Sequence, residues 1–464
     1  MGRLPLVAAG ARLPADAPTP GPASRGDHPV PDSRTVDVGW SLGAVLGLVC
    51  LAYVVWLPVS NGQVLYPVLA LLAAVSLIGA KTPSDWFLRS GGSCLLVVVL
   101  MAFVGSLNAN PGLLQQLLLW GGGLLLWGSW ANGITTAGIR RILTVVVCVS
   151  GMLSATIVLY VAGQMGVVPA IVPSSVVEMQ GAGFDLPGGS PAVRFYGLST
   201  LAAAGPLLAA GAVARQDTLL PSRRLVVPAA ILGVLAAVLA GRRAVLVVTV
   251  LAPALSLLLT SVLRGGPRRL RVSAGWVLAV PTLAMATILT WHTGPVLRAR
   301  EAVGDAIFVY TGIGASSGTK ADGDILRAEQ TSELLGAWAN HPVLGTGLGS
   351  IIPGYERSAE NPWMFELQYH QLLFNGGVLA VLILGFTAAM FVRTVVRVAR
   401  KVPEHIPVIA VTGIGALGML FANASNPYLQ AVAHWWAIAL FIGVVNALDR
   451  DSETDRSDSR SARP

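Results

Sequence analysis

Apolar residues are gathered in long blocks that are separated by short polar segments. The blocks lie near residues 38–57, 64–80, 92–107, 113–130, 141–162, 195–214, 225–240, 244–263, 273–292, 368–391, 407–424 and 430–447. A helix needs about 20 apolar residues to cross a hydrocarbon core of ~30 Å. The pattern therefore predicts an all-α, polytopic membrane bundle with about 12 transmembrane helices.

The composition supports this class and predicts the domain organisation. Hydrophobic residues make up 54% of the chain and charged residues only 12%, whereas soluble domains carry roughly 25% charged residues. Residues 1–37 are rich in Pro, Ala and Gly, and residues 448–464 alternate Asp, Ser and Arg. We expect both ends to be disordered cytoplasmic tails that flank a transmembrane domain over 38–447.

The distribution of charge and cysteine excludes several classes of function. The net charge is +8, but the basic residues lie between apolar blocks and form no dense patch, which argues against a nucleic-acid partner. Cys50, Cys94 and Cys148 lie inside apolar blocks, where a small apolar side chain packs well. No group of His, Asp and Glu has the spacing of metal ligands, so we expect neither a metal nor a cofactor.

Lysine and arginine also predict the orientation, because cytoplasmic loops of membrane proteins retain them. If the N-terminus is cytoplasmic, 23 of the 31 basic residues fall on the cytoplasmic side. We therefore predict a multi-pass protein of the cytoplasmic (inner) membrane with both termini in the cytoplasm. The other eight basic residues lie on the predicted outer side: Arg194, Arg242, Arg243, Arg298, Arg300, Lys320, Arg327 and Arg357.

The segment 293–367 is the longest predicted outer loop. Connections of this length are uncommon and usually either functional or disordered. The order of polar and apolar residues predicts a helix that Asp322 or Asp324 caps and that ends near Asn340. Its apolar positions recur on one side, as in helices that lie along a membrane surface. We therefore expect a folded extracytoplasmic loop.

Three places on the outer side carry arginines suited to binding phosphate. Arg242 and Arg243 form a turn at the edge of the bilayer, where an arginine costs roughly 2–3 kcal/mol on insertion scales. The guanidinium is a planar fork of donors that matches phosphate oxygens. The alternative interpretation is contact with lipid headgroups. Arg194 is equally consistent with an interfacial anchor or a ligand, and Arg327 with a solvated surface charge or a ligand.

Glu366 and His370 precede or begin the block at 368–391. Their spacing of four residues places them on one helical face at the mouth of the membrane. A carboxylate or imidazole at such an edge can act as a general base. The alternative is a helix-start glutamate beside an interfacial histidine.

The order of four motifs resembles that of the O-antigen ligase and polymerase family. NHPVLGTGLG at 340–349 resembles the family's NPLLGVGLG signature, and RFYGL at 194–198 resembles RxxGLF. GRRAVL at 241–246 resembles SRxxxL, and GVLA at 377–380 resembles a GILG-like helix end. Counting back from that end places Glu366 at the family's catalytic His or Glu, and Arg327 matches the arginine before the signature. The resemblance covers roughly residues 190–385.

The resemblance implies a GT-C-like membrane glycosyltransferase that needs no metal and inverts the anomeric carbon. Its donor would be a glycan on a polyprenyl diphosphate, such as undecaprenyl diphosphate, in the outer leaflet. Its further partners would be a glycan or envelope acceptor, membrane lipid and other polysaccharide-assembly proteins. The diphosphate ligands would be Arg194, Arg242, Arg243 and Arg327, and the base would be Glu366 or His370. Polymerase-like members often have Glu at this position and ligases usually have His, which favours a polymerase over a ligase.

Two other classes of function remain as alternatives. A transporter or flippase of lipid-linked oligosaccharides would suit the predicted topology equally well. Transporters tend to show paired halves and interrupted helices, whereas this chain shows no internal repeat, and its candidate charges lie on one side of the membrane. A non-catalytic assembly partner is a third alternative, and the candidate residues make it less favoured.

Overall fold

The computed structural model describes residues 42–59, 62–79, 81–185, 192–240, 243–265, 321–424 and 426–461. Within these ranges the protein is almost entirely helical, with one two-stranded sheet. Among the described residues, seven helical segments are long and apolar enough to cross a membrane: Asp85–Leu107, Thr136–Gln164, Tyr196–Val213, Ala244–Leu263, Gln368–Lys401, Pro403–Asn423 and Val432–Glu453. The chain is therefore an all-α protein of the multi-pass membrane class. The number of 12 spans and the likeness to GT-C enzymes stay predictions.

The helices follow the apolar blocks of the sequence. They are α1 (Leu42–Trp56), α2 (Gly62–Ile78), α3 (Asp85–Leu107), α4 (Leu113–Leu117), α5 (Gly123–Gly133), α6 (Thr136–Gln164), α8 (Leu201–Val213), α9 (Arg223–Leu239), α10 (Arg243–Leu263), α14 (Gln368–Lys401), α15 (Ile406–Asn423) and α16 (Trp436–Ser461). A π-helical turn, η1 (Leu118–Gly122), joins α4 to α5. The predicted tail 1–37, the block at 273–292 and residues 293–320 lie outside the described residues.

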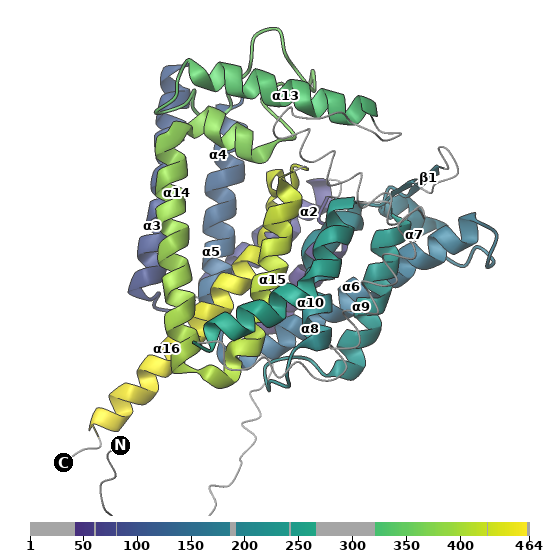
Figure 1. Cartoon of the computed structure of the whole chain (residues 1–464), viewed down its shortest axis with the longest axis vertical. Helices are drawn as coiled ribbons and strands as arrows, with labels where there is room; N and C mark the ends of the chain where they lie inside the picture. Colours follow the sequence, from purple (N-terminus) through teal and green to yellow (C-terminus); the bar gives the residue numbers. More distant parts are fainter. Residues whose placement is uncertain are drawn as a thin grey trace, which may run out of the picture. The chain divides into compact units, whose positions relative to one another are not determined.

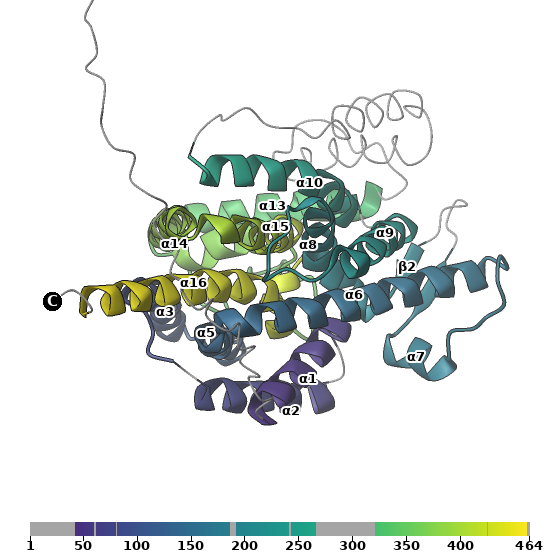
Figure 2. The ribbon, with the colours of Figure 1, turned by 90° about the horizontal axis from the view of Figure 1, so that it is seen from below.

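Helices α8 and α15 pack closely because small residues line their contact. Every residue of α8 from Leu201 to Ala210 is buried. A Cβ atom at Gly418 of α15 would come within 2.6 Å of Pro206 in α8. Without water to drive association inside a bilayer, close packing over small residues is what holds helices together. Helix α10 packs on one side of this pair, and α6 and α16 lie on the other (Figure 2).

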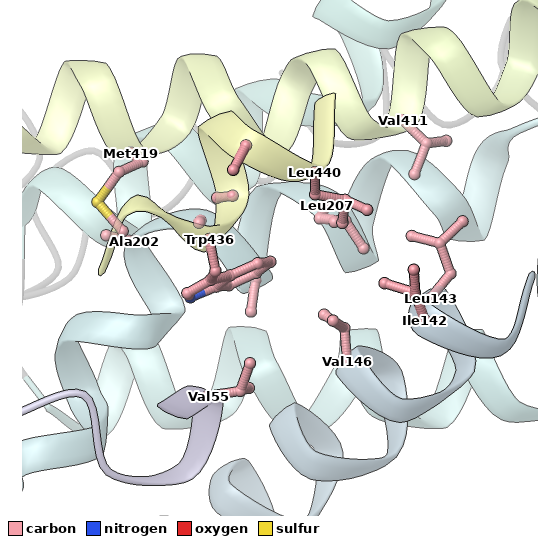
Figure 3. Packing of buried hydrophobic residues seen from close by; sticks show 14 of the residues in the cluster. Val55, Ile142, Leu143, Val146, Ala202, Leu207, Val411, Met419, Trp436 and Leu440 are labelled. Carbon is pink, nitrogen blue, oxygen red and sulfur yellow. The ribbon is translucent and has the colours of Figure 1, made fainter. Parts of the chain in front are cut away.

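Trp436 lies in the middle of the apolar core. Its side chain is fully buried, and Figure 3 shows it with Val55 of α1 below it and Met419 and Ala202 to one side. Leu207 of α8 continues the same cluster. One large ring thus contacts several helices that are far apart in sequence, which fixes their relative positions by dispersion contacts.

Hydrogen bonds between segments that are distant in sequence fall into two sets, one at each end of the bundle. In one set, the Gly112 N–H donates to the Gly349 carbonyl (3.1 Å), and Trp363 Nε1 donates to Gln115 Oε1 (2.9 Å). In the other, Ser84 Oγ donates to Asn446 Oδ1 (2.9 Å). We call the first set the α13 end, after α13 (Ala321–Ala339), and the second the opposite end. The described part of the long loop lies at the α13 end, and which end faces outward stays a prediction.

Helix α13 confirms the helix predicted in the long loop and corrects its start. Its described part begins at Ala321, so the backbone of Asp322 and Asp324 is already helical. It lies across the end of the bundle, above the long part of α14 in the view of Figure 1.

The segment 448–464, predicted to be a disordered tail, is helical at its start. Helix α16 continues to Ser461, and Asp449 is only 1% exposed. Both carboxylate oxygens of Asp449 are engaged, by Lys401 Nζ at 2.8 Å and by an Arg397 Nη at 2.9 Å. Because a buried carboxylate needs such partners, these ion pairs tie the start of the segment to α14.

Candidate functional site

The glycine-rich segment Gly345–Gly349 is a packing element of the α13 end. Gly345, Gly347 and Gly349 have φ values of +69°, +85° and +72°, which favour glycine. A Cβ atom at Gly347 would overlap the backbone of Gly105 in α3. The Leu348 N–H donates to the Met101 carbonyl (2.9 Å). The NHPVLGTGLG motif therefore binds the loop to α3 by close backbone contact.

The same loop closes an interruption in α14. Gly377 has φ +59° and ψ −170°, so the helix breaks there. The N–H groups of Val378 and Leu379 donate to the carbonyls of Pro342 (2.9 Å) and Val343 (3.1 Å). Backbone groups freed at membrane depth must find such partners. The break turns the first part of α14 away from its long part and toward α13 (Figure 1), and Glu366 lies just before this part.

Glu366 is held between two arginines that come from different parts of the loop. Its Oε2 accepts from Arg327 Nε of α13 at 2.9 Å, and its Oε1 accepts from an Nη of Arg357 at 2.5 Å. The exposed fractions of the side chains are 26% for Arg327, 29% for Arg357 and 22% for Glu366. The site is thus a charged cluster that solvent reaches.

The prediction that Glu366 and His370 lie on one helical face is wrong. Helix α14 begins at Gln368, and Leu367 before it has φ −84° and ψ 83°, outside helical geometry. Glu366 therefore lies in the irregular segment before the helix, while His370 is half-buried in its first turn. Which of the two is the base stays a prediction.

The backbone next to Glu366 is fixed from α13. The Leu367 N–H donates to Oε1 of Gln330 (3.0 Å), a fully buried side chain of α13. Leu334 of α13 packs with Phe365 and Phe374 in a small apolar cluster. Burial raises the pKa of the neighbouring Tyr355, and a hydrogen bond with Gln330 only partly opposes this. The Tyr355 phenol therefore stays protonated near neutral pH and is not a candidate base.

A second connection runs from the segment of Glu366 to the last loop of the bundle. Gln430, in η5 (Tyr428–Gln430), donates from Nε2 to the Phe365 carbonyl (2.9 Å) and to Gln371 Oε1 (2.8 Å). Gln371 in turn donates to the Trp363 carbonyl (3.0 Å). This amide network holds residues on both sides of Glu366.

The last loop also contacts the segment that follows Arg194. His434 of η6 (Val432–Trp435) is 1% exposed, and its Nε2 lies 2.6 Å from Ser199 Oγ. Because Ser199 Oγ donates to the Tyr196 carbonyl (2.8 Å), it accepts from His434, whose Nε2 therefore carries the proton. Ser199 belongs to η3 (Tyr196–Thr200). The loop 428–435 thus connects the segments of Arg194 and Glu366.

Arg194 itself ends a small hairpin. Strand β2 (Ala192–Arg194) pairs antiparallel with β1 (Gly183–Asp185), with Gly183 opposite Arg194. A short helix, α7 (Ser174–Met179), precedes this hairpin. The Arg194 residue is exposed. The end of this hairpin therefore places an arginine at the surface.

Of the four arginines that we predicted to bind the diphosphate, the structure describes only two with their side chains. It brings Arg327 and Glu366 together and connects Arg194 to them through the loop 428–435. Helix α10 begins at Arg243, whose side chain is outside the description, as is Arg242. In the part of the chain that is described, no three His, Cys, Asp or Glu side chains are grouped to hold a metal ion.

Sequence reasoning assigned no role to Arg357. The available signal was its place among the few basic residues on the predicted outer side, nine residues before Glu366. Gln330 and Gln430 carried no such signal, because amides are common on polar surfaces.

No family model matches the chain, and no curated protein matches it. The indications of function are therefore the sequence motifs and the geometry of the site.

Proposed function

We propose that this protein is a membrane glycosyltransferase that transfers or polymerises glycan units from a polyprenyl-diphosphate donor at the outer face of the cytoplasmic membrane. The observation that carries the proposal is the cluster of Arg327, Glu366 and Arg357 at the α13 end. It combines cations suited to a diphosphate with a carboxylate suited to a hydroxyl proton, in one solvent-accessible place.

The arginines supply electrostatic stabilisation. As the bond from the anomeric carbon to the diphosphate breaks, negative charge grows on the leaving phosphate oxygens. Fixed guanidinium donors stabilise that charge without any metal ion. Arg327 is the central ligand in this proposal. Arg194, Arg242 and Arg243 are its further ligands, as the family resemblance implies.

Glu366 is the base of the proposed reaction. It takes the proton of an acceptor hydroxyl while the hydroxyl oxygen attacks the anomeric carbon and the diphosphate leaves with the bonding electrons. Attack in line with the leaving group inverts that carbon. His370, in the first turn of α14, is the alternative base. A glutamate at 366 favours a polymerase over a ligase.

The interrupted helix α14 is the feature that a transporter would share. Transporters use the unwound backbone of such helices to bind substrate or ions. Here the Val378 and Leu379 N–H groups at the break are bonded to the loop at Pro342 and Val343. This bonding favours a fixed loop attachment over a flippase.

The direct test is product formation from an undecaprenyl-diphosphate-linked glycan in proteoliposomes. Glu366→Gln keeps the shape but removes the basicity, and we expect a loss of at least about a hundredfold in transfer rate. We expect His370→Gln to keep a measurable rate. The matched control is Glu356→Gln, which removes a charge from an exposed side chain of the same loop. An active Glu366→Gln with an inactive His370→Gln would make His370 the base. Full activity in both variants would refute the mechanism.

The sidedness of the site is a separate requirement. In a background without Cys50, Cys94 and Cys148, of which Cys148 is exposed, single cysteines can replace exposed Glu360 at the α13 end or exposed Glu404 at the opposite end. A membrane-impermeant maleimide should label the first in intact cells and the second only after the membrane is opened. The reverse pattern would place the site in the cytoplasm and exclude an outer-leaflet donor.

A further inference from the structure

The way in which Glu366 is held suggests what occupies the two arginines during catalysis. Each oxygen of its carboxylate accepts from a different guanidinium, Arg327 on one side and Arg357 on the other. With one guanidinium on each oxygen, the carboxylate is directed at the arginines and not at an acceptor hydroxyl. The described arrangement is therefore that of a resting site.

We propose that Arg327 and Arg357 form a two-arginine phosphate site that Glu366 occupies until the donor's diphosphate displaces it. This inference rests on the proposed function and assigns Arg357 as a further diphosphate ligand. One carboxylate bridging two guanidiniums fills the place that two linked phosphates would take. A diphosphate has more oxygens and more charge than a carboxylate, so it competes well for both forks.

The exposure of the cluster makes this exchange feasible. All three side chains are between 22% and 29% exposed, and ion pairs that solvent reaches are held weakly. The Leu367 N–H is meanwhile bound to the buried Gln330 side chain, which fixes the backbone beside Glu366. The exchange therefore requires rotation of side chains only.

The exchange couples donor binding to base activation. When the diphosphate takes Arg327 and Arg357, the Glu366 carboxylate is released beside it. The acceptor O–H bond then breaks toward Glu366, the new O–C bond forms at the anomeric carbon, and the C–O bond to the diphosphate breaks. The base is thus set free only where a donor is bound.

The test measures binding of undecaprenyl diphosphate to the purified full chain in detergent, with undecaprenyl monophosphate and inorganic pyrophosphate as further probes. Removing the competing charge by Glu366→Gln should tighten binding of undecaprenyl diphosphate by roughly tenfold, or 1.4 kcal/mol. Arg357→Gln should weaken it by a similar factor. Glu356→Gln makes the same change of charge in the same loop and should stay within about twofold of wild type. Thermal midpoints of all variants verify that each is folded.

The three probes separate the sources of phosphate. Strong preference for undecaprenyl diphosphate over the monophosphate supports a site for two linked phosphates, and equal binding of both would overturn it. If Glu366→Gln binds no more tightly than Glu356→Gln while the wild type transfers glycan, the exchange is refuted and the proposed function stands. If the wild type neither binds the diphosphate nor transfers glycan, both fall.

Discussion

Each end of the bundle holds a carboxylate between two cations, but the two clusters differ in exposure. At the opposite end, Asp449 is 1% exposed and its partner Lys401 is 14% exposed, while its second partner Arg397 is 50% exposed. At the α13 end, Glu366 is 22% exposed and both its arginines exceed 25%. Buried pairs are costly to separate, whereas pairs that water reaches exchange partners readily. The buried Asp449–Lys401 pair therefore braces the helices, and the cluster around the more exposed Glu366 is available to a ligand.

The surroundings of the two clusters reinforce this difference. Asp217, also at the opposite end, is fully buried and accepts from the Val408 N–H (3.2 Å) while its Oδ1 lies 3.1 Å from His405 Nδ1. At the α13 end, the buried contacts are made by backbone and amide groups, such as Gln330 and Gln430, and the charges are left at the surface. Rigid backbone with accessible charge is the arrangement that a binding site requires.

The largest expected effect concerns the rigidity of the α13 end. Gly347→Ala puts a Cβ atom into the backbone of Gly105 at a φ of +85°. We expect a destabilisation of about 3–5 kcal/mol and loss of transfer. Gly354→Ala is the matched control, since its φ is +80° but nothing lies within 4 Å of the new atom; it should cost about 1 kcal/mol. Thermal midpoints in detergent measure both, and equal values would refute the close contact.

The next effect compares the two carboxylates directly. Asp449→Asn leaves Lys401, only 14% exposed, facing a neutral amide, and we expect a loss of about 3 kcal/mol in stability. Glu366→Gln should cost less than about 1 kcal/mol, because its partners reach water. Denaturant unfolding in mixed micelles gives both values. A Glu366 variant as unstable as the Asp449 variant would make the α13 cluster a structural brace.

The smallest effect separates structural from functional hydrogen bonds. Ser199→Ala removes the acceptor of His434, and Ser84→Ala removes the donor to Asn446 at the opposite end. Each should cost about 1 kcal/mol in stability. Only Ser199→Ala should also lower transfer, by roughly tenfold, because it loosens the segment that carries Arg194. Equal transfer rates in the two variants would show that the loop 428–435 positions nothing.

The sequence by itself determined the membrane class, most helix positions and the presence of α13. These depend on local periodicity and on apolar length, which a bilayer imposes on any chain. The prediction for 448–464 differed because burial of Asp449 depends on Arg397 and Lys401, some fifty residues away. From its composition alone, such a charged segment is predicted to be exposed to solvent.

Only the tertiary structure decided the geometry of the site. The irregular backbone before Gln368 separates Glu366 from the helical face of His370. Arg327 meets Glu366 because α13 packs on the first part of α14, before the break at Gly377, whereas Arg357 reaches Glu366 from within the same loop segment. No local pattern encodes the pairing of Arg327 with Glu366, which are 39 positions apart. It arises when the glycine loop closes the break and brings both segments to one end of the bundle.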